Sequence, residues 1–480
     1  MSQSGAESTA RSYSRSSTGV GVSASRRSMS SMSNNALSLS NAIQGNIDIS
    51  KPAIIIELGK AFTKIGFAGD FSPRAIIRTE YIDHHLSTQR DLFDNLDKED
   101  KKYSRIFQFF MQIYYNVLLT MPRERRVVIV ESLLCPSHIR RALTIVFLER
   151  FCAPSILFIP SHLAATFPFN TTTALVMDLG FQETVVMPVA EGITMLSHWE
   201  AVNKGARKLY RKVREMLETD GQIECIDGSR RPLSPADWSL IDKFNMIEDI
   251  VVRSLFVTSM DRSASLQSGE SPHPVTQEMI MPLGIESLVV SGRIRELAAD
   301  CLFDSPNEDE PGLHEIVHSI IARVPIDLRH KLFSCILLVG GLAVLKGLRQ
   351  RLKEEIKCLG EMRGVKMYKE EKETTNEDMM KENKKEEEPN DIGFLMFPNS
   401  RMEPWMSWLG GSMFGSLSDT LQHASLSREE WLKEKILPDC TDFIDPFESK
   451  KTKIVSREKE EKGLNDSIRE VVKASQALKI

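Results

Sequence analysis

The sequence predicts an α/β protein with two lobes, and three observations lead to this prediction. The chain has 480 residues, which is more than one ordinary hydrophobic core organises. Short β-branched runs alternate along the chain with segments of helical periodicity, which is the pattern of α/β layers. One pattern of apolar strand, acid, leucine and glycine occurs twice, once in each half. This internal repeat indicates two related lobes.

The expected elements follow from these local patterns. Order is expected to begin near Ile47, after a segment with few large apolar residues. Runs rich in β-branched and aliphatic residues predict strands at 53–57, 126–130, 174–177, 184–189 and 336–339. Apolar residues at helical spacing predict helices over 106–120, 138–151, 247–257, 313–323 and 345–359.

The composition argues against several classes of protein. The 61 lysines and arginines against 66 aspartates and glutamates give a net charge of −5, so nothing supports nucleic acid as a partner. The longest uncharged run, 151–177, is broken by prolines and does not offer the roughly 20 consecutive apolar residues that span a bilayer, so no membrane insertion is expected. Seven scattered cysteines without a C-x-x-C pair indicate reduced thiols and a cytoplasmic protein.

Three segments differ in composition from the rest. Residues 1–46 are rich in serine, carry arginine and almost no acid, and are expected to form a disordered leader; a mitochondrial transit peptide is the alternative. Residues 366–388 mix lysines with acids and predict a solvated insertion. The charged tail 448–480 ends in apolar residues at helical spacing, which predict an amphipathic helix packed on its own domain or on a partner.

The repeated pattern places a carboxylate and a glycine at the end of a buried strand. These are Glu57 and Gly59 in the first copy, and Asp178 and Gly180 in the second. A strand returns after each glycine, so each copy predicts a hairpin whose backbone N–H groups can face an anion. Two such hairpins would clamp phosphates in a cleft between the lobes, with the carboxylates holding a hydrated metal ion. Two ordinary hairpins with a carboxylate at each turn fit the pattern equally well.

A third element follows the strand at 336–339. Gly340 and Gly341 come directly after this strand, and a helix is expected from Val344. A strand, two glycines and a helix N-terminus let the ribose or adenine of a nucleotide approach the backbone closely. A plain strand-to-helix turn is the alternative interpretation.

The segment 314–318, His-Glu-Ile-Val-His, matches the H-E-x-x-H pattern of zinc proteases. The third ligand is missing, because Ile321 and Val324 occupy the next positions of the longer motif. Apolar residues around the two histidines form a stripe at helical spacing. We therefore expect a core helix here and assign no metal ligand.

Several strings resemble signatures of the actin superfamily. They are the string from Glu57 through 66–70 and 73–75, the segment 314–329, Val339-Gly340-Gly341 and 408–412. The resemblance runs with gaps from about Ala53 to about Phe447. Within the superfamily, 125–138 and 154–157 resemble the divergent actin-related proteins at the pointed end of the dynactin filament.

The resemblance implies an actin-like fold, with two lobes of the ribonuclease-H type around an adenine-nucleotide cleft. The first lobe would comprise 47–170 and 397–447, and the second 171–396 with the charged insertion at 366–392. The cofactor would be ATP or ADP with Mg²⁺. The residues implied to bind it are Glu57, Gly59, Lys64, Asp178, Gly180, Gly340 and Gly341. A solvent-facing Lys64 on a hairpin strand is the alternative for that residue.

The hydrolytic residues of the family are not preserved here. Ser161 and Val185 stand where actins place the glutamine and histidine that order the attacking water. Phe181 stands where actins carry an acid, so its ring is expected near the metal. We therefore expect no catalytic residue and no enzymatic activity.

The nucleotide contacts are altered as well. Leu58 and Lys60 replace small polar residues of the first turn, and Gln182 replaces a glycine of the second. Val251 and Val252 stand where actins have the charged pair that holds base and ribose. Loss of each charged hydrogen bond costs about 1.5–3 kcal/mol. Two states stay open: a slowly exchanging structural nucleotide, or no nucleotide.

The resemblance implies a subunit that caps the pointed end of the actin-like filament of dynactin, and so supports dynein-driven microtubule transport and cargo attachment. Its partners would be the filament subunits, an actin-related protein and actin, the other pointed-end subunits and, indirectly, dynein, in the cytoplasm and cytoskeleton. The region between Ile77 and Tyr114 is shorter than in actin, and this truncation is expected to terminate the filament. An actin-fold ATPase or small-molecule kinase, and an actin-related subunit of a nuclear chromatin complex, are the alternatives.

Overall fold

The computed structural model describes residues 51–83, 88–93, 99–268, 276–306, 310–362, 392–417 and 424–437. The serine-rich leader, most of the charged insertion and the C-terminal tail lie outside the described residues, and so do the predictions made for them. The α/β fold class predicted from the sequence is confirmed.

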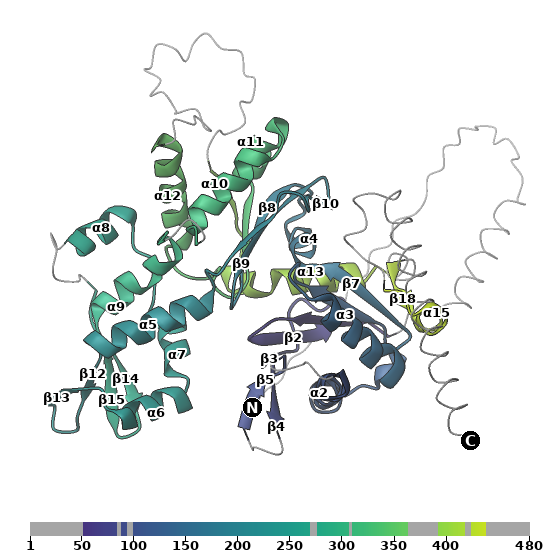
Figure 1. Ribbon diagram of the computed structural model, residues 1–480, viewed down its shortest axis with the longest axis horizontal. Coiled ribbons are helices and arrows are strands. Elements are labelled where there is room, and N and C mark those ends of the chain that lie inside the picture. The colour runs from purple at the N-terminus through teal and green to yellow at the C-terminus, as the bar shows by residue number, and fades with distance from the viewer. Residues whose placement is uncertain are drawn as a thin grey trace, which may run out of the picture. The chain divides into compact units, whose positions relative to one another are not determined.

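The first sheet has six strands in the order β18-β7-β6-β1-β2-β3 (Figure 1). Its central strand β1 is parallel to β6 and antiparallel to β2. β1 and β6 read IIIEL and VVIVE, and such β-branched runs suit central strands covered on both faces. The strands are β1 (Ile54–Leu58), β2 (Phe62–Phe67), β3 (Ala75–Arg78), β6 (Val127–Glu131), β7 (Ser155–Pro160) and β18 (Leu426–Ser427).

Helices cover both faces of this sheet. Ile54 and Ile56 belong to the core cluster that contains residues of α2 and α3, whereas Ile55 belongs to the cluster of Trp408 on α13. A two-stranded sheet, β4 (Glu80–Asp83) with β5 (Thr88–Asp91), follows β3. The helices are α2 (Glu99–Gln112), η1 (Ile113–Leu118), η2 (Pro122–Glu124), α3 (Ser137–Thr144), η3 (Ile145–Arg150), α4 (Ser161–Ala164), η4 (Phe167–Phe169), η7 (Ser400–Trp405), α13 (Met406–Gly415) and α15 (Arg428–Glu434).

The second sheet repeats the hairpin and parallel-strand arrangement of the first. Its order is β10-β9-β8-β16-β17, with β11 also paired to β9, and β8 is antiparallel to β9 and parallel to β16. The strands are β8 (Ala174–Leu179), β9 (Thr184–Ala190), β10 (Ile193–Thr194), β11 (Glu200–Val202), β16 (Ile336–Val339) and β17 (Phe394–Leu395). The predicted strand repeat is therefore present in two separate sheets.

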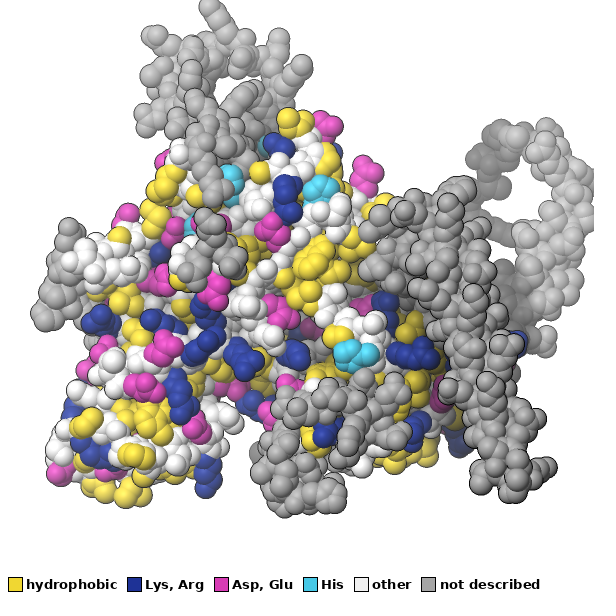
Figure 2. All heavy atoms as spheres, viewed as in Figure 1, with side chains coloured by type: hydrophobic (Ala, Val, Ile, Leu, Met, Phe, Trp, Pro, Cys, Tyr) yellow, Lys and Arg dark blue, Asp and Glu magenta, His cyan; other side chains and the backbone are white. Residues whose placement is uncertain are grey.

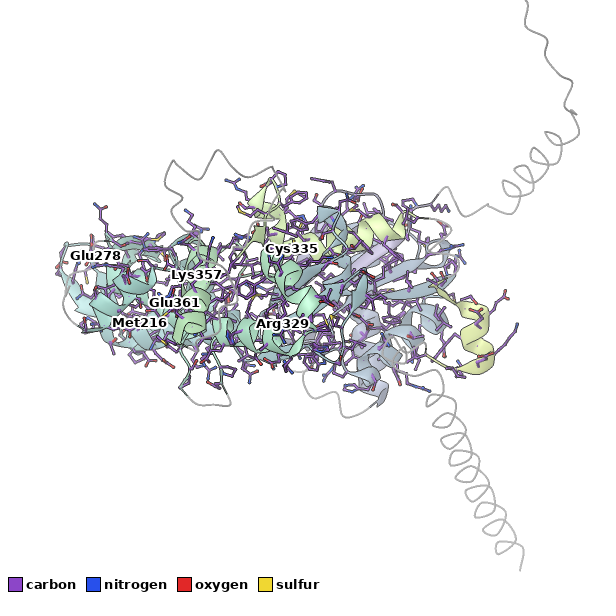
Figure 3. The ribbon with its side chains drawn as sticks, turned by 90° about the horizontal axis from the view of Figure 1, so that it is seen from above. Met216, Glu278, Arg329, Cys335, Lys357 and Glu361 are labelled. Atoms are coloured by element: carbon purple, nitrogen blue, oxygen red, sulfur yellow. The ribbon has the colours of Figure 1, made fainter. Side chains whose placement is uncertain are left out.

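A third sheet, in the order β13-β12-β15-β14, lies within the second lobe (Figure 1). Its strands are β12 (Gln222–Glu224), β13 (Arg230–Pro232), β14 (Met279–Leu283) and β15 (Glu286–Val290). The helices of this lobe are α5 (Ala206–Asp220), α6 (Pro235–Lys243), α7 (Met246–Arg253), α8 (Met260–Ser268), α9 (Gly292–Leu297), η5 (Ala298–Leu302), α10 (Leu313–Arg323), α11 (Ile326–Ser334) and α12 (Leu348–Met362). Figure 3 shows from above that Lys357 and Glu361 lie on α12 and that Arg329 lies on α11.

One apolar cluster contains residues of both large sheets. It includes Ile55 and Val128 of the first sheet, Val176 and Val339 of the second, and Trp408 of α13. The indole Nε1 of Trp408 donates to the backbone oxygen of Ile55 at 3.2 Å, so the helix is fixed to the central strand. This shared apolar core joins the two lobes.

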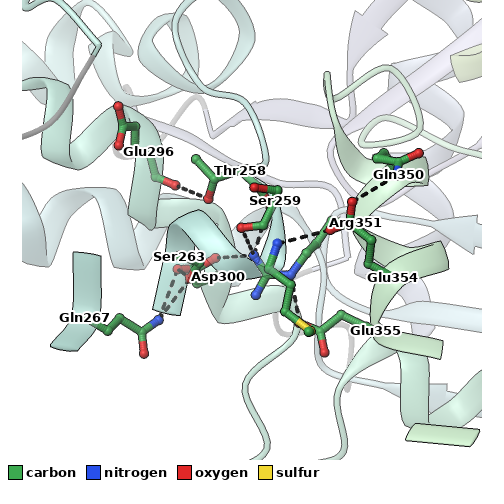
Figure 4. Close-up of polar contacts among 11 residues, drawn as sticks. Thr258, Ser259, Ser263, Gln267, Glu296, Asp300, Gln350, Arg351, Glu354 and Glu355 are labelled. Carbon is green, nitrogen blue, oxygen red and sulfur yellow. Dashed lines mark hydrogen bonds and ion pairs between the residues drawn. The ribbon is translucent and has the colours of Figure 1, made fainter. Parts of the chain in front are cut away.

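A buried ion pair braces the helices of the second lobe (Figure 4). Nη1 of Arg351 on α12 lies 3.4 Å from Oδ1 of Asp300 on η5 and donates to the carbonyl oxygen of Thr258 at 3.0 Å. Ser263 of α8 donates to Oδ2 of Asp300 at 2.6 Å, and Gln267 donates to the same oxygen at 3.2 Å. Burial raises the pKa of Asp300, whereas these partners lower it. The Asp300 carboxylate thereby connects three helices, η5, α8 and α12.

Three predicted helices differ in detail from expectation. α2 and α3 each continue as a π-helical turn, η1 and η3, so the predicted spans 106–120 and 138–151 are each composed of two helix types. The helix expected from Val344 begins at Leu348, because turns occupy the residues after Gly341. The two glycines therefore precede a turn and not a helix N-terminus.

The surface agrees with the balanced composition. On the face shown in Figure 2, basic and acidic side chains are interspersed across both lobes. Among the helices of the described ranges, none combines the length and the apolar character needed to cross a membrane.

Candidate functional site

A cleft of about 1230 Å³ is lined by residues of both lobes. Its walls include the turn of the β1–β2 hairpin, here called the first hairpin, and that of the β8–β9 hairpin, here called the second hairpin. The seven residues predicted to bind a cofactor all line this one cleft: Glu57, Gly59, Lys64, Asp178, Gly180, Gly340 and Gly341. Residues more than 280 positions apart in the sequence are thus brought together.

The two hairpins have the same backbone turn. In the first, the N–H of Gly59 donates to the carbonyl oxygen of Phe62 at 3.1 Å; in the second, the N–H of Gly180 donates to that of Glu183 at 3.1 Å. A Cβ on Gly59 would lie 2.7 Å from the Phe62 oxygen, and one on Gly180 would lie 2.8 Å from the Glu183 oxygen. Glycine is therefore required at both turns by close approach of the backbone.

The turn carbonyls of the first hairpin are held by one threonine. Oγ1 of Thr79 donates to the Gly59 oxygen at 2.8 Å, and its N–H donates to the Ala61 oxygen at 3.0 Å. The hydroxyl of Thr63, the repeated threonine of the sequence pattern, lies 2.8 Å from the Thr79 hydroxyl. Both threonines are fully buried, so this contact anchors the hairpin to the segment after β3.

The second hairpin is held by a helix N-terminus. The N–H groups of Ala206 and Arg207, at the start of α5, donate to the oxygens of Gly180 and Phe181 at 3.1 and 2.7 Å. The repeated threonine, Thr184, donates its hydroxyl proton to the carbonyl oxygen of Lys204 at 2.7 Å. The repeated threonines thus anchor both hairpins, although their partners differ.

The carboxylate of the first hairpin is paired within the hairpin. Glu57 lies directly opposite Lys64 in the β1–β2 register, and the ammonium of Lys64 forms an ion pair with Oε1 of Glu57. Burial raises the pKa of Glu57, and the charge of Lys64 opposes that rise. Oε2 of Glu57 is buried with no hydrogen-bond partner among the described residues. Lys64 therefore faces the cleft and is not solvent-facing.

The second hairpin has a different residue at the matching position. Asp178 lies opposite Val185 in the β8–β9 register, so no cation pairs with it across the strands. Val185 is buried, and its carbonyl oxygen lies 3.4 Å from Nε2 of His162. Ser161 Oγ lies 3.3 Å from Nδ1 of the same ring. Burial lowers the pKa of His162, whereas the charge of Asp178 raises it, so we assign a neutral imidazole near pH 7.

Gly340 lines the cleft and lies directly beside Asp178. Its φ is +90°, and a Cβ there would lie 2.7 Å from Oδ1 of Asp178 and 2.5 Å from the carbonyl oxygen of Leu179. A Cβ on Gly341 would meet nothing within 4 Å. The first glycine is thus required by packing, and the second leaves open space beside the cleft.

The mouth of the cleft contains contacts that sequence reasoning missed. Arg78 at the end of β3 forms an ion pair with Glu248 of α7, in the other lobe. The ring of Phe181 packs edge-on against Tyr210 of α5, with centroids 5.7 Å apart. Val252 is 74% exposed at the cleft wall. No local pattern marks Arg78 or Glu248, because 170 positions separate them.

The H-E-x-x-H segment is part of the core helix α10. Leu313, Ile316 and Val317 on this helix are buried in the core of the second lobe. Glu315, at the third helical position, accepts a hydrogen bond from the backbone N–H of the N-cap residue Gly312 at 2.9 Å. Glu315 therefore caps the helix, which agrees with the core-helix prediction.

The fold and the duplicated hairpins describe a two-lobed protein of the actin class. Residues 49–435 match the Actin family. The chain belongs to this family, as the sequence strings predicted. It is 26% identical over 434 residues to "Actin-related protein 10" of Dictyostelium discoideum, a match that covers 80% of this chain and 86% of that protein.

The residues that line the cleft differ between its hairpin turns and the positions where the resemblance implies contacts to base and ribose. Oε2 of Glu57, which is buried with no hydrogen-bond partner among the described residues, and the side chain of Asp178 line the cleft, and such carboxylate oxygens can hold a hydrated metal ion. On the opposite wall, Val251 and Val252 offer no charged group to base or ribose. Glu57, Gly59, Lys64, Asp178 and Gly180 would hold the phosphates and Mg²⁺.

Proposed function

We propose that the chain is a non-enzymatic actin-related subunit that caps the pointed end of the dynactin filament in the cytoplasm. Membership of the actin family and similarity to an actin-related protein support this proposal. The observation that carries it is the short segment between β3 and α2, residues 79–98, whose described part is the single β4–β5 hairpin. In actins this segment builds the small subdomain that faces the pointed end. A subunit with this subdomain reduced can join a filament through its opposite face and offer no site for the next subunit.

We infer that the partners are the filament subunits, an actin-related protein and actin, and the other pointed-end subunits, with dynein engaged indirectly to support microtubule transport. The test is affinity isolation of the tagged full-length chain from cytosol at mild salt, followed by mass spectrometry. Recovery of dynactin filament and pointed-end subunits is expected. Recovery of chromatin-remodelling subunits, or of no stable partner, would contradict the proposal.

We propose that the cleft holds ATP or ADP with Mg²⁺ as a structural ligand and does not hydrolyse it. Support comes from Val185, whose apolar side chain cannot orient a water, and from Ser161, whose hydroxyl lies beside His162. The purified chain should release nucleotide on denaturation, and phosphate release from added ATP should stay at the rate of the buffer control. Steady turnover that scales with protein concentration would contradict this assignment.

A further inference from the structure

An ion pair at the cleft mouth connects the two lobes. Arg78 is the last residue of β3 in the first sheet, and Glu248 lies in the first turn of α7 in the second lobe. Nη2 of Arg78 donates a hydrogen bond to Oε2 of Glu248. The Arg78 side chain is 36% exposed and the Glu248 side chain is 24% exposed. The strand and the helix belong to different lobes, so the ion pair connects the lobes beside the cleft that Glu248 lines.

In the first lobe, Arg78 is coupled to the first hairpin. Phe62, which closes the turn of that hairpin, pairs with Arg78 in the β2–β3 register. The guanidinium lies over the ring of Phe62, 5.2 Å from its centroid. The position of the arginine therefore depends on the position of the hairpin turn.

In the second lobe, Glu248 is coupled to the second hairpin. Its helix α7 packs against α5, the helix that carries Tyr210. Burial raises the pKa of the Tyr210 phenol to about 12, the charge of Glu248 adds to this rise, and the charge of Arg78 opposes it. Tyr210 in turn packs on Phe181, which lies in the turn of the second hairpin. Phe62, Glu248, Tyr210 and Phe181 all line the cleft. The ion pair is thus connected to the first hairpin turn through Phe62, and to the second through the packing of α7 on α5.

We propose that Arg78 and Glu248 form a latch that holds the two hairpins together and slows escape of the ligand between them. The consequence for ligand exchange rests on the proposed nucleotide site, whereas the closure itself does not. Ion pairs of this partial exposure contribute little to folding, so breaking the latch should open the mouth without unfolding either lobe.

The test uses charge reversal in the full-length chain. Arg78→Glu and Glu248→Arg each place like charges across the mouth, and the double variant restores the pair in reverse orientation. Hydrogen exchange of the backbone amides in both hairpin turns reports closure. Dissociation of a fluorescent ATP analogue, chased with excess ATP, reports ligand escape. Each single variant should speed both processes about three- to tenfold, and the double variant should return toward the wild type.

A matched control separates latch opening from a general effect of charge. Arg214 and Asp242 form an exposed ion pair at 2.7 Å within the second lobe, so Arg214→Glu should leave amide exchange in the hairpin turns unchanged. Single variants that exchange like the wild type, or a double variant no slower than the singles, would overturn the latch. Failure to bind the ATP analogue would contradict the nucleotide proposal alone, since the amide-exchange measurement still decides the latch.

Discussion

The two hairpins of the cleft have one backbone and two sets of side chains. Both turns close through a glycine N–H to a carbonyl oxygen at 3.1 Å, and both carry a buried threonine as anchor. In the first, Glu57 and Lys64 face each other as an ion pair; in the second, Asp178 faces Val185. The two hairpins share the backbone geometry of the turn, and they differ in the side chains that surround it.

This difference distinguishes the residues that the fold requires from the residues that only a hydrolytic reaction would require. A glycine at each turn is fixed by backbone contacts that any side chain would disturb. The residue opposite the carboxylate has no such constraint, because it projects into the cleft or against a neighbouring side chain. A chain can therefore keep the duplicated frame while losing the groups that order a water.

The largest expected effect is at the glycine that backs the second hairpin. Gly340→Ala would place a Cβ 2.7 Å from Oδ1 of Asp178 at a φ of +90°, and should lower the free energy of unfolding by about 3 kcal/mol. The measurement is urea denaturation. Gly341→Ala is the matched control and should change stability by less than about 0.5 kcal/mol, because a Cβ there meets nothing within 4 Å. Equal losses at the two glycines would contradict the assigned packing.

A pH effect in the alkaline range should arise at the anchor of the second hairpin. Lys204 is fully buried, and burial together with the charge of Lys208 lowers its pKa from 10.5 to about 8. Between pH 8 and 10.5 the unfolded chain keeps the proton that the folded chain has lost, so stability rises with pH by about 3 kcal/mol from this group. The free energy of unfolding is measured against pH for the wild type and for Lys204→Met, and the difference between the two curves should show that rise. A difference that stays flat across this range would contradict it.

The ion pair of the first hairpin should matter next. Lys64→Met leaves the buried Glu57 carboxylate without its cation and should cost about 2 kcal/mol by thermal or urea denaturation. Adding Glu57→Gln should recover more than half of this loss, because the uncompensated charge is then gone. The matched position in the second hairpin, Val185, carries no charge, so Val185→Ala should show a loss that Asp178→Asn does not relieve.

The smallest expected effect concerns the threonine anchors. Thr63→Val and Thr184→Val each remove one buried hydrogen bond and should each lower stability by about 1 kcal/mol. The two losses should agree closely if the anchors are equivalent. A loss at Thr184 several times smaller than that at Thr63, measured under the same denaturant conditions, would show that the helix N-terminus and not the threonine holds the second turn.

Most of the frame could be predicted from sequence because it depends on local patterns. The β-branched runs at Ile54 and Leu175 specify buried strands, and the acid-Leu-Gly sequence after each specifies the turn. The seven residues predicted for the site come together in one cleft. The strand and turn predictions succeed because strand, turn and returning strand are contiguous in the chain, whereas the binding role of the seven residues stays a prediction.

The remainder of the site depends on contacts that no local pattern encodes. The partner of Arg78 lies on a helix of the other lobe, and the partner of Thr63 lies in the segment after β3. The ring of Phe181 packs edge-on against Tyr210 of α5 and lines the cleft, and no local pattern indicates this contact. His162 is buried by tertiary packing that its neighbours in sequence do not reveal.

From this comparison we propose that the chain acts through filament-contacting surfaces and not through chemistry in the cleft. The most direct test is to add the purified full-length chain to filaments of the actin-like dynactin subunit and to follow both ends of single filaments by fluorescence microscopy. We predict that elongation stops at pointed ends at a concentration far below that of the free subunit, while barbed ends grow at an unchanged rate. Continued growth of pointed ends at saturating concentrations of the chain would contradict the account.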